Sequence, residues 1–267
     1  VEASHFFGEK VQYIPAKDPL FYTADVHGNA IARDRMLAIK KIVDDKCGTF
    51  VMTIDAVMDQ VVPLSDIKNH KMTFKMGETL EEATIAEEFV ARGYEKAPFV
   101  EAPGEFAVRG GIIDIFPYTQ ESPYRIELWG DEIDSIRSFD AQSQRSLENL
   151  DDVTIYPAAE QPMEKNGVSF LDYFKETETL FFLDELNHLE ENAKAVQEEF
   201  QQSCENRKEK GEISLSGDWM CTWEELCHKI NDRNCVAMSL LDPKKSNWKI
   251  SGQFNITVKS MSSYQSS

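Results

Sequence analysis

Two carboxylates at the end of an apolar run are the residues whose types and spacing could serve a nucleotide hydrolase. Asp184 and Glu185 follow TLFFL, and P-loop enzymes place a magnesium-side acid and a water-polarising acid at the carboxyl end of such a strand. Adjacent acids are also typical of a helix N-terminus, where the dipole favours anions. The phosphate-binding motif GxxxxGK[ST] is absent from the sequence. We therefore expect a degenerate Walker B-like pair, with no ATP hydrolysis by these residues unaided.

The remaining catalytic signals are absent. The sequence contains neither HExxH nor GxSxG, and its histidines are scattered without metal-ligand spacing: His5, His27, His70, His188 and His228. We therefore expect no catalytic residue, no metal site and no cofactor in this chain.

The run YRIELW places an arginine and a tryptophan on one face of a predicted strand. Alternation puts its apolar residues on the core face and Arg125, Glu127 and Trp129 on the other face. The next two residues, GD, fit a two-residue hairpin loop, which would pair Trp129 with Glu132 and Glu127 with Asp134.

A second arginine belongs to the same predicted sheet. Arg109 precedes two glycines, which indicate a bulge or a close backbone approach. A tryptophan beside arginines on an exposed sheet face is typical of a protein-binding hot spot, and we expect Glu127 and Asp134 to orient the arginines. The alternative is that Trp129 covers a sheet end and the arginines form solvated ion pairs of little energetic value. The residues alone leave both interpretations open.

The predicted secondary structure that would carry these residues changes along the chain, from mixed strands and helices to short strands and back. Helical spacing, apolar runs and turn residues predict strands at 10–16 and 49–54 around a helix at 30–45, a helix at 55–62 stopped by Pro63, and a connection or edge strand at 65–77. A helix closed by Gly93 follows, and residues 97–157 read as short strands and turns. The last third predicts strands at 179–186, 235–241 and 254–258, an acidic helix reaching about Lys208, and a helix opened by the capping box Thr222–Glu225.

Composition bounds the class of protein. The 267 residues, 42% of them apolar, suffice for one large or two smaller globular domains, and no apolar run is long enough for a membrane helix. Because the chain starts with Val1, we expect a fragment. Five cysteines without CxxC spacing fit a reducing cytoplasm. The net charge is −19, with 47 acidic against 28 basic residues, so the chain should be repelled by DNA.

Several ordered runs resemble a known family. PGEFAVRGGIIDIFP, PYRIELWGDEIDSIRSFD and QRSL resemble the UvrB-like module at the amino end of the bacterial transcription-repair coupling factor (Mfd) family. VQYIPAKDPLFYTADVHGNAIARDRMLAIKKI and TFVMTIDAVMDQVVP resemble its first α/β part, and MSSYQSS resembles its end. The nearest alternative is UvrB itself, but YIPAKDPLFYTADVHGNAI leaves no room for the hairpin with which UvrB threads DNA.

The resemblance implies a fold and a division into domains. It implies an α/β fold with a degenerate, P-loop-NTPase-like parallel-sheet core into which an α+β domain like UvrB domain 2 is inserted. The expected divisions are 1–78 for part of domain 1A, 79–157 for the UvrA-binding domain, and 158–267 for domain 1B and the return of the core.

The resemblance also implies a function. Such a factor is an ATP-dependent DNA translocase that displaces stalled RNA polymerase and recruits nucleotide excision repair, with ATP, Mg²⁺, DNA and polymerase bound by other parts of the parent. This module would bind UvrA, and the family's UvrA-contacting positions fall on Arg109, Arg125 and Trp129. Another domain of the parent would mask that face. A UvrB-type ATP-dependent damage-recognition protein and an autoinhibitory clamp on the parent motor are the alternatives.

Overall fold

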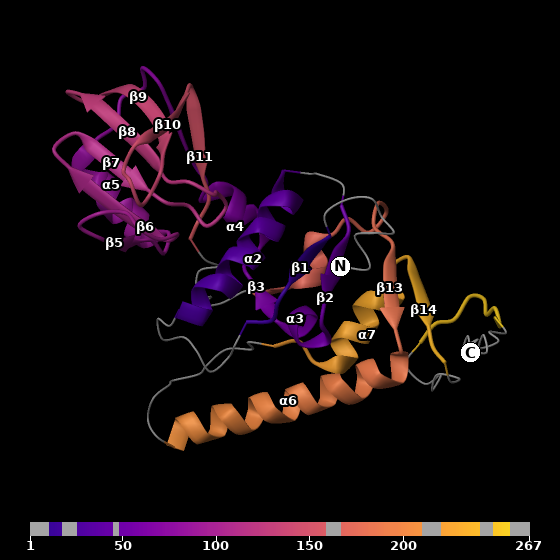
Figure 1. Cartoon of the computed structure of the whole chain (residues 1–267). Coiled ribbons are helices and arrows are strands. Elements are labelled where there is room, and N and C mark those ends of the chain that lie inside the picture. The colour runs from indigo at the N-terminus through magenta and orange to yellow at the C-terminus, as the bar shows by residue number, and fades with distance from the viewer. Residues whose placement is uncertain are drawn as a thin grey trace, which may run out of the picture.

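The computed structural model describes residues 11–17, 26–44, 48–158, 167–209, 220–240 and 248–256. It is a mixed α/β structure with one six-stranded sheet and four two-stranded sheets among these residues. Figure 1 shows the six-stranded sheet, its helix and β11 (Asp152–Ile155) as a unit at one end of the molecule, with the two parallel strand pairs and the long helix α6 (Leu186–Glu209) at the other. The run MSSYQSS and Cys47 lie outside the described residues.

The chain opens with the predicted strand, helix and strand. β1 (Gln12–Ile14) pairs in parallel with β2 (Phe50–Met52), and α2 (Val26–Val43) connects them. The apolar positions of the helix are buried against the strand, with Met36, Ile39 and Ile14 at 0% exposure. The period-3.6 pattern therefore identified the buried face of this helix correctly.

The next segment departs from the prediction. The expected helix over 55–62 is a single short helix, α3 (Ile54–Met58), followed by β3 (Gln60–Val61), which pairs with β12 (Val168–Ser169). A β-branched valine pair favours the extended backbone there. The segment 65–77, expected as a connection or edge strand, contains the helix α4 (Leu64–Asn69) and then β4 (Met72–Lys75), which pairs with β11 (Asp152–Ile155).

The six-stranded sheet carries one apolar face covered by a helix. Its strand order is β10-β9-β8-β7-β6-β5, antiparallel except for the β5-β6 pair. The strands are β5 (Glu95–Lys96), β6 (Glu105–Arg109), β7 (Ile112–Ile115), β8 (Tyr124–Trp129), β9 (Glu132–Phe139) and β10 (Ser146–Leu150). The helix α5 (Glu82–Ala91) packs Ile85 and Phe89 onto this face, and the Phe89 ring lies 5.3 Å from that of Phe106. Gly93 ends the helix at φ +85°, as predicted.

The β8-β9 hairpin has the predicted loop but a shifted register. Gly130 adopts φ +64°, and Trp129 pairs with Glu132 as expected. Glu127 pairs with Ser135 and not with Asp134, because the register shifts between Glu127 and Leu128. Asp134 is thus the additional residue of a β-bulge, a local feature that strict period two cannot show.

The last third builds a second, smaller core. β13 (Phe181–Asp184) pairs in parallel with β14 (Cys235–Met238), a short 3₁₀ helix spans Phe170–Tyr173, and α6 and α7 (Trp223–Asn231) follow the predicted positions. The Thr222–Glu225 capping box is present in full. Residues 254–256, predicted as strand, have no regular structure, and the rest of that run is not described. Among the described helices, none has both the length and the apolar character to cross a bilayer.

Candidate protein-interaction site

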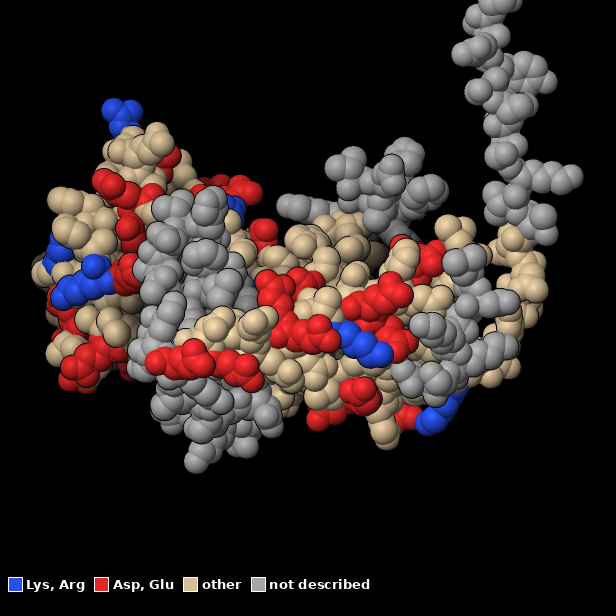
Figure 2. Space-filling model, turned by 90° about the horizontal axis from the view of Figure 1, so that it is seen from below, with Lys and Arg blue, Asp and Glu red and all other residues tan. Residues whose placement is uncertain are grey.

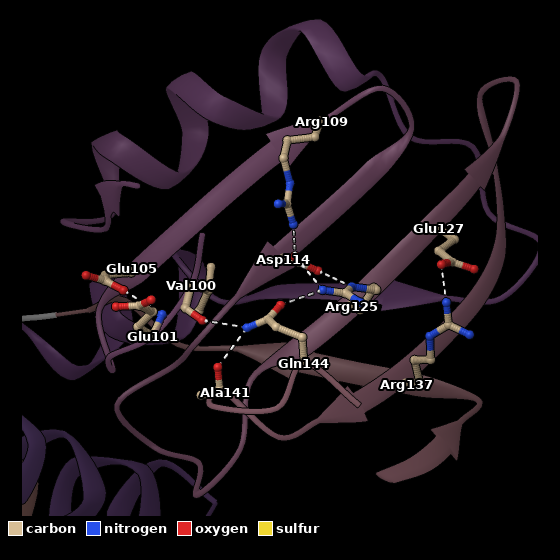
Figure 3. A network of polar contacts seen from close by, with 10 residues as sticks. All are labelled: Val100, Glu101, Glu105, Arg109, Asp114, Arg125, Glu127, Arg137, Ala141 and Gln144. Carbon is tan, nitrogen blue, oxygen red and sulfur yellow. Dashed lines mark hydrogen bonds and ion pairs between the residues drawn. The ribbon is translucent and has the colours of Figure 1, made fainter. Parts of the chain in front are cut away.

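The face of the six-stranded sheet opposite α5 gathers the predicted binding residues. Arg125 on β8 lies directly across from Asp114 on β7 and from Arg137 on β9. Arg109 lies at the end of β6, one strand further. Figure 3 shows Arg109 and Arg125 converging from different strands on Asp114.

Asp114 is the centre of this arrangement. Its side chain is fully buried, and its Oδ2 accepts hydrogen bonds from Arg109 Nη2 at 2.5 Å and Arg125 Nη2 at 2.9 Å. Its Oδ1 accepts a third bond from Arg125 Nε at 2.7 Å. The Arg125–Asp114 contact is therefore bidentate, the geometry that fits a guanidinium to a carboxylate best. One buried charge thus holds two arginines in fixed positions.

The two guanidinium groups also rest on aromatic rings. Arg125 lies 4.4 Å from the centroid of Phe139, which is buried, and Arg109 lies 4.7 Å from that of Phe99, which is 58% exposed. Cations at this distance are attracted to the π face of a ring. The aromatic rings therefore add to the constraint that Asp114 imposes.

Access to solvent differs among the three main residues. Trp129 is 83% exposed, the side chain of Arg109 is 37% exposed, and that of Arg125 is only 16% exposed. The hydrogen bonds that Arg125 donates to Asp114 raise the pKa of Arg125, and the charges of Asp114 and Glu127 act in the same direction, against the effect of burial. Trp129 and Arg109 thus offer the accessible area, while Arg125 is largely covered.

The expected orienting role of Glu127 and Asp134 is not what the contacts show. Glu127 accepts hydrogen bonds from Arg137 and from the Ser135 hydroxyl, and neither Arg109 nor Arg125 bonds to it. Asp134 is exposed in the bulge. The carboxylate that orients the arginines is Asp114, because it lies directly opposite Arg125 on the neighbouring strand.

A further contact ties Arg125 to a neighbouring loop. Gln144 Oε1 accepts a hydrogen bond from Arg125 Nη2 at 3.0 Å, and its amide nitrogen donates to the carbonyl oxygens of Val100 and Ala141. The backbone of Gln144 has φ +58°, a conformation that residues other than glycine adopt at a cost in conformational energy. Figure 3 shows this side chain between Arg125 and the two carbonyl groups.

Sequence reasoning missed Asp114, Gln144, Arg137 and the two stacking phenylalanines. Period two places Asp114 on the same face as its neighbours Arg125 and Ala107, so the pattern in IIDIF held the signal. Phe99 lies in a connection with no periodic pattern, and nothing in the sequence marks it.

The two residues of the Walker B-like pair lie at the end of β13. Asp184 ends β13, as predicted, and it is exposed; Glu185 follows it with φ +53°. Glu185 Oε1 accepts a hydrogen bond from the backbone of Leu240, so this carboxylate joins the ends of β13 and β14. The described residues contain no group of three or more His, Cys, Asp or Glu side chains that could hold a metal ion.

The charge distribution of the protein differs from that of a nucleic-acid-binding surface, which is rich in lysine and arginine. On the face shown in Figure 2, acidic side chains are spread over the protein and basic ones are few. With a net charge of −19, the chain offers phosphate groups little attraction. The arginines at Asp114 are a local basic feature on an acidic molecule.

Comparison with known proteins agrees with the resemblance found in the sequence. Residues 72–160 match the family model "UvrB interaction domain", which begins at β4, before the expected boundary at residue 79. The Bacillus subtilis transcription-repair-coupling factor is 40% identical over 134 residues, which is 49% of this chain and 11% of that protein. The Escherichia coli K12 factor is 30% identical over 167 residues, covering 62% and 14%, and the Staphylococcus aureus MRSA252 factor is 32% identical over 163 residues, covering 61% and 14%.

The matched stretches span only 11% to 14% of these relatives. The matched family region contains the whole six-stranded sheet and the converging arginines on it. The chain is therefore homologous to part of the transcription-repair-coupling factors, including their UvrB interaction domain.

Proposed function

We propose that this chain is a protein-binding module of a transcription-repair-coupling factor, and that the outer face of its six-stranded sheet binds UvrA. The observation that carries the proposal is a sheet face that bears Trp129, 83% exposed at the end of β8, and two arginines held by a buried carboxylate on the strand between them. The match to the UvrB interaction domain supports a partner among repair proteins.

The chemistry of the face defines the partner surface. An exposed indole needs an apolar socket, and the solvent-facing side of Arg109 needs a carboxylate or carbonyl acceptor. We propose that UvrA provides an acidic surface with such a socket. Most of the affinity would come from Trp129 and Arg109, since a few well-packed aromatic and arginine residues dominate interfaces.

The α/β part around this domain serves as scaffold in the proposal. β1-β2 and β13-β14 are short parallel sheets of the kind found in P-loop proteins, and the sequence lacks the phosphate-binding motif. Glu185 bonds the backbone of Leu240, so it serves the fold. DNA translocation, polymerase displacement and their ATP and Mg²⁺ would belong to other parts of the parent protein.

The test is a calorimetric titration of purified UvrA with the chain. We expect Arg109→Ala to weaken binding at least about tenfold, equivalent to about 1.4 kcal/mol, because it removes an accessible arginine while Arg125 keeps Asp114 paired. Lys194→Ala is the matched control, since it also removes one positive charge but lies on α6 in an exposed pair with Glu190. Equal affinity of Arg109→Ala and the wild-type chain would refute the proposal.

A further inference from the structure

We propose that Asp114 is the positioning residue of the interaction site: it fixes the guanidinium groups of Arg109 and Arg125 in one geometry before the partner arrives, and Gln144 locks this geometry from the side. The inference rests on the proposed UvrA binding and specifies how the site achieves it. Asp114 itself would not touch the partner, because its side chain is 0% exposed.

The surroundings of Asp114 do not require a charge for folding. Its cross-strand neighbour on β6 is Ala107, which belongs to a small apolar cluster with Val100, Phe116 and Phe139 on the same side of the sheet. Apolar residues of similar volume in place of both Asp114 and Arg125 would extend this cluster and avoid the cost of desolvating two charges, and such replacements of whole buried ion pairs are often neutral or stabilising. The folding of the domain therefore does not explain the charge at this position, and its contacts with Arg109 and Arg125 do.

What it holds is the conformation of two long side chains. Free arginines sample many rotamers, and binding must immobilise them at an entropic cost. Here each guanidinium is bonded to one carboxylate and stacked on its own ring, Arg125 on Phe139 and Arg109 on Phe99. The immobilisation has therefore taken place in the free protein, so that more of the contact energy appears as affinity.

Gln144 contributes a second, independent constraint. Its three side-chain hydrogen bonds join Arg125 to the connection containing Val100 and to its own loop at Ala141. Its backbone remains at φ +58° although the residue is not glycine. Strained backbone that is held by surrounding contacts is typical of sites where geometry matters.

The charge at Asp114 separates positioning from simple electrostatics. Asp114→Asn removes a negative charge from beneath a basic patch and preserves the size of the side chain. If net charge alone governed binding, an acidic partner would bind this variant more tightly. If Asp114 acts by positioning, the variant binds more weakly, because the asparagine amide group presents donors to the guanidinium groups. The two accounts therefore predict changes of opposite sign in the affinity of Asp114→Asn for the partner.

The experiment compares wild-type chain, Asp114→Asn, Arg109→Ala and Tyr94→Phe in calorimetric titrations with purified UvrA, at a temperature where all are folded. Tyr94→Phe is the stability control, since it removes one buried hydrogen bond to the carbonyl of Tyr156 on the opposite face of the sheet. We expect Asp114→Asn to bind at least about tenfold more weakly and Tyr94→Phe to bind like the wild type. Wild-type or tighter binding by Asp114→Asn, together with weak binding by Arg109→Ala, would overturn the inference and leave the proposed function standing. Wild-type binding by Arg109→Ala would instead overturn the proposed function.

A second variant decides the matter if Asp114→Asn does not fold. Gln144→Gly removes the bonds to Arg125 and to the two carbonyl groups, while glycine adopts positive φ without strain. We expect this variant to retain the stability of the domain and to bind UvrA about fivefold more weakly. Binding equal to that of the wild type would overturn the positioning role.

Discussion

Replacing Arg125 with alanine should destabilise the six-stranded sheet as well as weaken the binding of UvrA. The variant removes two hydrogen bonds to Asp114, one to Gln144 and the stacking contact with Phe139. Asp114 stays at the centre of the sheet, where its side chain has no exposure, with Arg109 as its remaining ion-pair partner.

The size of the effect follows from this loss. Removing one partner of a buried ion pair costs roughly 3–5 kcal/mol, and we expect about 3 kcal/mol because Arg109 still neutralises part of the charge. For a domain of about 90 residues, this would lower the unfolding midpoint by more than about 12 °C. Arg109→Ala should cost only about 1 kcal/mol, since its side chain is 37% exposed and Arg125 keeps Asp114 paired.

Native-state hydrogen exchange is the suitable assay, because it reports opening of this sheet separately from the rest of the chain. The amides of Ile113 and Ile126 face each other across β7 and β8, and both side chains are at 0% exposure. We expect the opening free energy at these amides to fall about three times as far in Arg125→Ala as in Arg109→Ala. Equal losses in the two variants, or an unchanged value in Arg125→Ala, would refute the account of Asp114 as the buried centre.

Three further expectations concern other parts of the chain. Trp129→Ala should leave the unfolding free energy within about 0.5 kcal/mol of wild type, because the indole is 83% exposed, yet weaken UvrA binding at least about tenfold; a melting curve and a titration check both. Thr222→Ala should destabilise the α7 region by about 1 kcal/mol in a urea titration through loss of the capping box, and an unchanged midpoint would contradict this. Burial raises the pKa of Cys227 to about 12, against about 8.5 for an unfolded thiol, so the folded state keeps a proton that the unfolded state loses. The unfolding free energy should therefore fall by about 1 kcal/mol as pH rises from about 8.5 to 9.5, and it should fall less in Cys227→Ala. Urea titrations of both proteins across this pH range check this, and equal slopes of unfolding free energy against pH would contradict it.

Local chemistry predicted those elements whose signals are complete within a few residues. The apolar spacing of α2, the capping box at Thr222 and the glycine that closes α5 act through neighbouring residues, and the structure has each in place. The Trp129–Glu132 pair was equally accessible, because the hairpin loop GD fixes the residues beside it.

The rest depended on contacts between distant residues. Alternation places Asp114 on the same face as Arg125, but it cannot show that the charge of Asp114 is buried or that Gln144 joins Arg125 to Val100. The β-bulge at Asp134 shifted the register by one residue, so Glu127 faces Ser135. The expected helix at 55–62 became partly β3 because that strand pairs with residues 168–169, more than 100 positions later.

Hydroxyl-radical footprinting of the chain with and without UvrA tests the central claim most directly. In the free chain, Phe99 and Phe182 are equally exposed at 58%, but Phe99 lies beside Arg109 and Phe182 lies on β13 in the other part of the molecule. We predict that UvrA protects Trp129 and Phe99 from oxidation and leaves Phe182 as reactive as before. Oxidation of Trp129 and Phe99 at the free rate in a complex that has formed would contradict the account.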